Sequence, residues 1–147
     1  FVRRPADVEH LQRELHRLEA QDIGIVLKIE NKAAFENLPE LLLTAMRSPC
    51  VGVMIARGDL AVEVGFDRLA EVQEEIMWAC EAAHVPVIWA TQVLDTLARV
   101  GQASRAEVTD AAMAQRAECV MLNKGPHVEA AVTALDDILR MAGKAFR

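Results

Sequence analysis

Short apolar runs that alternate with longer amphipathic segments constrain the fold of this chain more than any other feature of its sequence. Unbroken apolar runs cover residues 23–27, 50–55, 85–90 and 119–122. Runs of this length without polar positions are typical of strands, and the run at residues 23–27 is typical of a strand that is buried on both faces. The segments between them are longer, and residues 5–18 and 67–83 carry apolar residues at helical spacing. Alternating strands and helices predict an α/β fold with a parallel sheet.

The remaining segments extend the same alternation to both ends of the chain. We expect residues 1–3 to be the end of a further strand. Residues 33–46 are expected to be helical with a break near Pro39, because proline removes a backbone donor from a helix. Residues 128–146 are expected to form the last helix. The predicted order is therefore the end of one strand, a helix and four strand–helix units.

Sequence signals at two helix starts support this order. Pro5 is suited to a first helical turn, where its missing N–H is not needed, and Asp7 complements the positive end of that helix. Ser104 and Glu107 have the spacing of a capping box at the start of a later helix.

Two architectures fit a chain of alternating strands and helices. One is an open, doubly wound sheet, and the other is part of a (β/α)₈ barrel. The sequence has no GxGxxG motif after its first strand, which disfavours a dinucleotide-binding fold. The length of 147 residues is sufficient for a single core.

Composition excludes several classes of protein. Hydrophobic residues make up 52% and charged residues 26% of the chain, as in folded globular proteins, and the formal net charge is −6. Without a strongly basic cluster, a nucleic-acid partner is not expected. No apolar run approaches the length that spans a membrane, so no membrane partner is expected. Because the first residue is Phe1 and not methionine, we expect the chain to be a piece of a longer protein.

The three cysteines suggest a reducing compartment. Cys50, Cys80 and Cys119 form no CxxC pair. We interpret them as buried, reduced thiols, which is the usual state of free cysteine in cytosolic proteins. A cytoplasmic location is therefore expected.

Polar residues follow each predicted strand at its carboxyl end. They are Lys28, Glu30 and Asn31 after the first strand, Arg57, Gly58 and Asp59 after the second, Thr91 and Gln92 after the third, and Asn123 and Lys124 after the fourth. Parallel strands bring their carboxyl ends to one rim. In (β/α)₈ enzymes this rim carries the active site.

Lys28 and Glu30 are two residues apart, so an extended backbone points both side chains to the same face. Asp59, at the end of the neighbouring strand, can join them. Two carboxylates with room for water and substrate oxygens suit Mg²⁺ or Mn²⁺, which prefer oxygen ligands. The alternative is an ordinary Lys–Glu ion pair at a strand end.

Two further strand ends allow a functional and a structural interpretation. Gly58 permits close backbone approach, and a helix start after it could bind a carboxylate or phosphate. Alternatively, Asp59 is the N-cap of an ordinary turn. The Thr91 hydroxyl could hold a substrate or a water, or it could cap the next helix.

Together these segments resemble pyruvate kinase. The matching pieces, in order, are residues 1–3, 28–31, 54–60 (Met-Ile-Ala-Arg-Gly-Asp-Leu), 86–92 (Pro-Val-Ile-Trp-Ala-Thr-Gln), 104–107 (Ser-Arg-Ala-Glu) and 120–122. Several motifs in the right order and spacing make the resemblance specific, and it spans nearly the whole chain. It implies that residues 1–147 are one partial domain, from the end of barrel strand four to helix eight. We therefore expect half of a (β/α)₈ barrel with about four strands and five helices.

The resemblance also implies an activity and a role for each matched residue. Pyruvate kinases transfer a phosphoryl group from phosphoenolpyruvate to ADP in glycolysis, giving pyruvate and ATP. Lys28 corresponds to the lysine that stabilises charge on the phosphoryl group, and Glu30 and Asp59 correspond to the protein ligands of the divalent metal. Gly58 and Asp59 correspond to the amides that bind the substrate carboxylate. Thr91 corresponds to a substrate-site threonine, and Arg57, which we group with the catalytic residues, corresponds to the arginine that shapes the loop.

The sequence departs from the family pattern in one place and covers only part of it. Residues 123–126 read Asn-Lys-Gly-Pro where the family usually has Ser-Gly-Glu-Thr, so a hydroxyl and a carboxylate are missing and a lysine is gained. The family's K⁺ ligands, its substrate-phosphate arginine, its lid domain and its carboxy-terminal domain have no counterpart in this chain. We therefore expect residues 1–147 alone to be inactive in phosphoryl transfer.

Two alternatives to a kinase are open at this point. A metal-dependent lyase or aldolase that forms a pyruvate enolate also carries glutamate on one strand and aspartate on the next. A non-catalytic half-barrel scaffold is the other alternative. Because a half-barrel leaves strand edges and an apolar face uncovered, we also expect a homo-oligomer.

Overall fold

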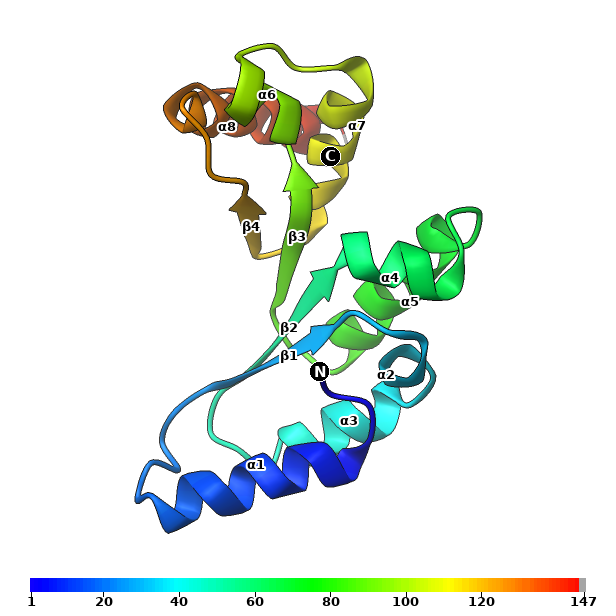
Figure 1. The fold of residues 1–147 in the computed structure, drawn as a ribbon, viewed down its shortest axis with the longest axis vertical. Coiled ribbons are helices and arrows are strands. Elements are labelled where there is room, and N and C mark those ends of the chain that lie inside the picture. The colour runs from blue at the N-terminus through cyan, green and yellow to red at the C-terminus, as the bar shows by residue number, and fades with distance from the viewer. Residues whose placement is uncertain (146–147) are drawn as a thin grey trace. The chain divides into compact units, whose positions relative to one another are not determined.

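The computed structural model describes residues 1–145 and contains alternating strands and helices in the predicted order (Figure 1). The strands are β1 (Ile25–Ile29), β2 (Val51–Ala56), β3 (Val87–Val93) and β4 (Cys119–Leu122). The helices are α1 (Pro5–Arg17), α2 (Lys32–Glu36), α3 (Leu38–Ala45), α4 (Arg57–Val64), α5 (Leu69–Ala82), α6 (Asp95–Val100), α7 (Arg105–Met113) and α8 (Val128–Ala145), with a 3₁₀ helix, η1, at Ala114–Arg116.

The order of the strands distinguishes between the two predicted architectures. The sheet has the order β1-β2-β3-β4, so consecutive strands are neighbours, and β1 pairs with β2 in parallel with Ile25 opposite Val51. A doubly wound sheet instead reverses its strand order at a switch point. Consecutive parallel strands joined by helices are the arrangement of a barrel segment, and the prediction of half of a (β/α)₈ barrel is confirmed.

The number of helices differs from the expected five. The described residues contain eight α-helices, because three of the connections hold two helices each, namely α2 with α3, α4 with α5, and α6 with α7. At the first of these breaks Asn37 ends α2 and precedes α3, and Pro39 occupies the first turn of α3. Proline is tolerated there because a first-turn N–H has no partner within its helix.

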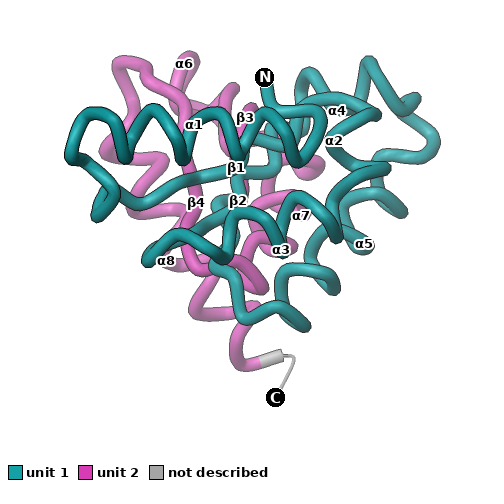
Figure 2. Tube along the Cα trace, turned by 90° about the horizontal axis from the view of Figure 1, so that it is seen from below, with its two compact units in different colours: residues 1–88 teal, residues 89–147 magenta. Residues whose placement is uncertain are grey.

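The chain divides into two compact units, residues 1–88 and residues 89–147 (Figure 2). Strand β3 begins in the first unit and ends in the second. The core of the first unit lies between one face of the β1–β2 pair and the helices. Ile25, Leu27 and Ile29 of β1 are buried, and Val53 and Ile55 lie opposite the last two. Burying each of these side chains stabilises the fold by about 1.5–3 kcal/mol.

The prediction that the first strand is buried on both faces is wrong. Val26, which points to the opposite face from Leu27, is 50% exposed. Strand β1 therefore has one apolar face against the helices and one open face, and Lys28 lies on the open face. The strand also begins at Ile25 and not at residue 23, because residues 21–23 form a turn.

Two other expectations are corrected. Residues 1–3 are not a strand, since the carbonyl groups of Val2 and Arg3 accept hydrogen bonds from the side-chain amides of Asn31 and Asn37 at 3.1 Å each.

Cys50 and Cys119 are exposed, whereas Cys80 is buried as predicted. Cys50 immediately precedes β2 and Cys119 begins β4, so both lie at the amino ends of strands, outside the packed layer. Phe146, expected at the end of the last helix, lies outside the described residues.

The second unit is built around the long helix α8. Its buried side chains are Ala131, Leu135 and Ala142, and α8 packs against α6 and α7. Helix α7 begins with the predicted capping box, in which the Ser104 hydroxyl accepts from the Glu107 amide and the Glu107 carboxylate accepts from the Ser104 amide. No helix within residues 1–145 combines the length and apolar character needed to cross a bilayer.

Candidate functional site

Lys28, Glu30 and Asp59 lie together in the first unit, at the carboxyl ends of β1 and β2. The ammonium group of Lys28 donates a hydrogen bond to Glu30 Oε2, and Lys28 Nζ is 3.9 Å from Asp59 Oδ2. Lys28 is the next-to-last residue of β1, and Glu30 follows that strand directly. The shared face predicted from the spacing of two is therefore present, and the neighbouring strand end supplies the second carboxylate.

The three side chains differ in exposure. Glu30 is buried, with 8% of its side chain exposed, whereas the side chains of Lys28 and Asp59 are 43% and 70% exposed. A carboxylate is costly to bury without a partner. The Lys28 hydrogen bond lowers the pKa of Glu30 from its ordinary value, and this effect outweighs the burial that raises it. Glu30 is therefore a buried anion at neutral pH.

One oxygen of Glu30 has no hydrogen-bond partner. The Oε1 atom is buried and accepts no hydrogen bond, although it forms an ion pair with the amino-terminal nitrogen of Phe1 at 3.3 Å. The Phe1 ring also lies near Lys28, with its centroid 5.8 Å from Nζ. An unsatisfied buried carboxylate oxygen is a suitable ligand for a cation, and this oxygen fits a divalent metal.

The described residues provide only part of a metal coordination shell. Within residues 1–145, no group of three or more His, Cys, Asp or Glu side chains converges in a way that could hold a metal ion. Glu30 and Asp59 offer two carboxylates, so water or substrate oxygens would have to complete the shell. Mg²⁺ usually binds proteins in this way, through one or two carboxylates and several waters.

Helix α4 places Arg57, Gly58 and Asp59 in its first turn. Its N-cap is Ala56, so the alternative in which Asp59 is the N-cap is wrong, and Asp59 instead lies where a carboxylate complements the positive helix end. The side chain of Arg57 is buried although it carries a charge. A buried arginine is almost always paired, and Arg57 fits a structural role beneath this turn.

Thr91 lies in the second unit, near the carboxyl end of β3. Its φ of 68° is in the left-handed region, as are those of Gln92 at 57° and Leu94 at 48°. This conformation costs a residue with a side chain roughly 1–2 kcal/mol. The N-cap of α6 is Leu94, so Thr91 does not cap the next helix. Strained backbone of this kind is concentrated at functional sites.

Sequence reasoning missed the contacts that surround this strained turn. Asn123, after β4, donates from Nδ2 to Oδ1 of Asp95, the first residue of α6. The Glu107 carboxylate accepts from the Thr96 amide at 2.5 Å as well as from the Ser104 amide at 2.9 Å. The polarity of residue 123 was visible in the sequence, but its partner 28 residues away was not.

Asn31 is a further residue that sequence reasoning left without a role. It is buried, its Oδ1 accepts from the Ala34 amide at 2.9 Å, and its Nδ2 donates to the Val2 carbonyl. It therefore caps α2 and attaches the amino-terminal segment beside Glu30.

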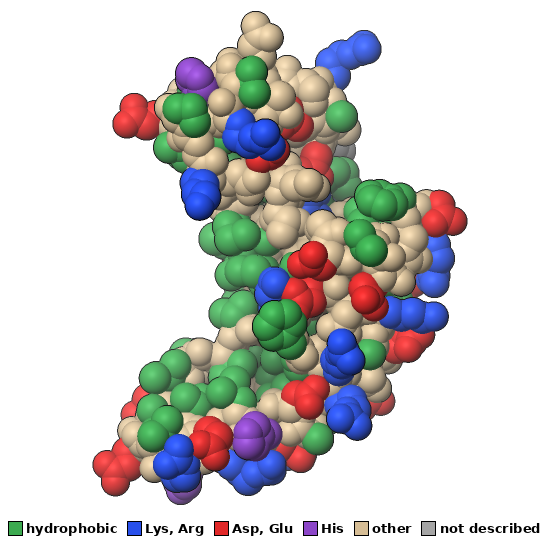
Figure 3. Space-filling model, in the orientation of Figure 1, with side chains coloured by type: hydrophobic (Ala, Val, Ile, Leu, Met, Phe, Trp, Pro, Cys, Tyr) green, Lys and Arg blue, Asp and Glu red, His purple; other side chains and the backbone are tan. Residues whose placement is uncertain are grey.

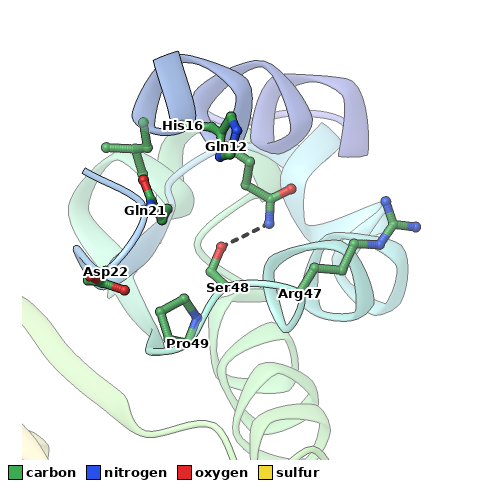
Figure 4. A pocket seen from close by; sticks show the side chains of 8 residues that line it. Gln12, His16, Gln21, Asp22, Arg47, Ser48 and Pro49 are labelled. Carbon is green, nitrogen blue, oxygen red and sulfur yellow. Dashed lines mark hydrogen bonds between the residues drawn. The ribbon is translucent and has the colours of Figure 1, made fainter. Parts of the chain in front are cut away.

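A hollow in the first unit lies away from these residues, at the amino ends of β1 and β2. It has a volume of about 540 Å³, and α1 and the two loops that precede the strands line it (Figure 4). Gln12 donates there to Ser48 Oγ at 2.9 Å and to the Thr44 carbonyl at 2.9 Å. None of the predicted site residues lines this hollow.

The molecular surface carries interspersed acidic and basic side chains, without an extended basic patch on the face shown in Figure 3.

Comparisons with known proteins agree on one family. The model of the family "Pyruvate kinase, barrel domain" matches residues 1–133. Pyruvate kinase of Bacillus licheniformis is 41% identical over 114 residues, which cover 78% of this chain and 19% of that protein. Pyruvate kinase of Staphylococcus saprophyticus is 36% identical over 144 residues, which cover 94% of this chain and 24% of that protein. Pyruvate kinase 2 of Candida glabrata is 36% identical over 152 residues, which cover 99% of this chain and 29% of that protein. The chain thus spans less than a third of the length of these relatives.

Proposed function

Because the chain belongs to the pyruvate kinase family, we propose that it carries the divalent-metal and phosphoenolpyruvate part of a site that transfers a phosphoryl group to ADP, giving pyruvate and ATP. The observation that supports this proposal most is the buried carboxylate of Glu30, with one oxygen paired to Lys28 and the other without a hydrogen bond.

In this proposal Glu30 and Asp59 hold Mg²⁺ or Mn²⁺. Glu30 offers Oε1, which accepts no hydrogen bond, and Asp59, with a side chain that is 70% exposed, can turn toward a cation. The metal, when bound, neutralises charge on the oxygens of the phosphoryl group and the enolate. The K⁺ of the family would need ligands outside this chain.

Lys28 acts in this proposal as a fixed positive charge. The hydrogen bond to Glu30 holds its ammonium group at the strand end, and 43% of the side chain remains accessible to an incoming anion. Phosphoryl transfer passes through a loose transition state in which charge spreads over the oxygens of the transferred group. A preorganised ammonium lowers the energy of that charge without having to move during the reaction.

The substrate carboxylate is proposed to bind the first turn of α4. This turn contains Gly58 and Asp59, and the positive end of a helix favours an anion. Arg57, buried at the start of the same helix, is proposed to fix the shape of the turn. The role of Thr91 as a substrate-side residue is proposed from the resemblance in sequence and from its strained backbone.

The test is to measure pyruvate formation by the complete protein from phosphoenolpyruvate, ADP and Mg²⁺. Glu30→Gln should lower kcat/KM at least a hundredfold, whereas Glu36→Gln, an exposed carboxylate paired with Lys32, should leave it within twofold. No pyruvate from the unaltered protein, together with cleavage of a 2-oxo acid, would replace this proposal with the lyase alternative.

We further propose that residues 1–147 by themselves self-associate and do not turn over phosphoenolpyruvate. We also propose that the complete protein functions in the cytoplasm. Self-association is supported by the position of β1 at an edge of the sheet and by the half-exposed Val26 on its open face. The cytoplasmic location is supported by the three cysteines, which form no disulfide within residues 1–145. Sedimentation at micromolar concentration checks the first point, and a strictly monomeric mass would contradict it.

A further inference from the structure

The segment Thr91–Leu94, which covers the end of β3 and the residue before α6, forms a left-handed turn that needs external support. Three of its residues, Thr91, Gln92 and Leu94, have positive φ although none is glycine. Backbone held in this way persists only when surrounding contacts determine it. The residue that follows the turn, Asp95, begins α6, and the Ala98 amide donates to the Leu94 carbonyl at 2.9 Å to close the first helical turn. Whatever holds Asp95 therefore also limits the conformations of Thr91–Leu94.

Asn123 holds Asp95 in place. It follows β4 directly and donates from its side-chain amide to Asp95 Oδ1. The other oxygen of Asp95 lies 3.2 Å from Arg99 Nη1, within α6. Only 22% of the Asp95 side chain is exposed. Because its partner is a partly shielded carboxylate, the Asn123 bond is of the stronger, charge-assisted kind.

The rest of the same segment packs on the other end of α6. The His127 amide donates to the Ala98 carbonyl at 2.9 Å. The backbone at Gly125 approaches so closely that an added Cβ would overlap the same carbonyl oxygen. Residues 123–127 thus contact α6 at its start and near its end, and they form a tether with a defined position.

We propose that Asn123 is a positioning residue that fixes Asp95 and thereby holds the left-handed turn that presents Thr91. The role of Thr91 rests on the proposed function, but the tether itself does not. Residues 123–126 differ from the usual family sequence, so the resemblance gives Asn123 no role. The geometry gives Asn123 a supporting role, in which it holds the neighbouring turn and does not contact a ligand.

The test exchanges the donor and the acceptor. Asn123→Asp removes the donated N–H and places two carboxylates face to face, whereas the double variant Asn123→Asp with Asp95→Asn restores one donor and one acceptor in reversed order. Asn123→Ala removes the donor without adding charge. Asp136→Asn, an exposed carboxylate that pairs with Arg140 on α8, is the matched control for a lost carboxylate.

The first readout is hydrogen exchange at the Ala98 amide, measured by NMR without substrate. We expect exchange at least tenfold faster in Asn123→Asp and Asn123→Ala, a return to within threefold in the double variant, and no change in Asp136→Asn. Unchanged exchange in both single variants, or no recovery in the double variant, would overturn the proposal.

The second readout is steady-state kinetics of the complete protein with phosphoenolpyruvate. We expect kcat/KM to fall at least tenfold in Asn123→Asp and to recover in the double variant, which a general loss of stability would not produce. If exchange follows this pattern while kcat/KM does not change, the link to Thr91 is refuted. If the unaltered protein does not turn over phosphoenolpyruvate, the proposed function fails, and the exchange data still decide whether the tether exists.

Discussion

Lys28 donates a hydrogen bond to the buried carboxylate of Glu30, two residues further along the chain. The pair combines a partly exposed cation with a buried anion, and one anion oxygen has no hydrogen-bond partner. The same contact stabilises the fold and, in the proposed function, holds Glu30 as a metal ligand. Changes to either residue should therefore affect stability and metal binding in separable ways.

Lys28→Met should destabilise the first unit by about 1–3 kcal/mol, since it leaves a buried carboxylate without its hydrogen-bond donor. The free energy of unfolding in urea measures this effect. Lys32→Met is the control because Lys32 and Glu36 are both more than half exposed, and such surface pairs contribute about 0–1 kcal/mol. An equal decrease in the free energy of unfolding in the two variants would show that the Lys28–Glu30 contact contributes no more than a surface ion pair.

The Lys28 hydrogen bond and the nearby positive charge lower the pKa of Glu30 below its ordinary value of 4.5, despite the opposing effect of burial. A lowered folded-state pKa stabilises the fold at pH values above the ordinary pKa, and this contribution is lost as the pH falls through the folded-state value. Unfolding free energies measured from about pH 7 to pH 3 should therefore fall more steeply in the unaltered chain than in Glu30→Gln. Parallel curves would show that Glu30 is not held as an anion by the fold.

Glu107 connects α7 to the first turn of α6. Its carboxylate accepts from the amides of Ser104 and Thr96, and although burial raises its pKa, these bonds lower the pKa overall. Glu107→Ala should cost about 1–2 kcal/mol, more than Ser104→Ala, because it removes contacts to both helices. Urea unfolding of the two variants provides the comparison. A larger loss in Ser104→Ala would contradict the connection to α6.

Two glycines should respond in opposite ways to replacement by alanine. Gly125→Ala should destabilise the second unit by about 1–3 kcal/mol, since the new Cβ would overlap the backbone carbonyl of Ala98. Gly143, within α8, has only the flexible end of Gln115 nearby at 3.5 Å, so Gly143→Ala should stabilise by about 0.5–1 kcal/mol through helix propensity. Thermal unfolding distinguishes the two. A stable Gly125→Ala variant would show that residues 123–127 are free to move.

Features set by local sequence were predictable. The strands were found because short apolar runs mark them, and the proximity of Lys28 and Glu30 followed from the two-residue period of an extended chain. The break between α2 and α3 followed from Pro39, and the capping box from the spacing of Ser104 and Glu107. Each of these depends on residues within a few positions of one another.

Features set by distant neighbours were not predictable from one sequence. The partner of Asn123 is 28 residues away, and the second contact of Glu107 is 11 residues away, so no periodicity indicates them. The exposure of Val26 and Cys50 could not be predicted either. An apolar run shows that a strand is apolar, but the packing of other elements decides which of its faces is covered.

Mn²⁺ binding to the complete protein, followed by electron paramagnetic resonance, shows whether Glu30 and Asp59 hold the divalent metal as we propose. We predict that Glu30→Gln and Asp59→Asn each weaken Mn²⁺ binding at least tenfold, that phosphoenolpyruvate tightens binding in the unaltered protein, and that Glu36→Gln changes neither. The same Mn²⁺ affinity in the unaltered protein, Glu30→Gln and Asp59→Asn would exclude Glu30 and Asp59 as ligands of the metal.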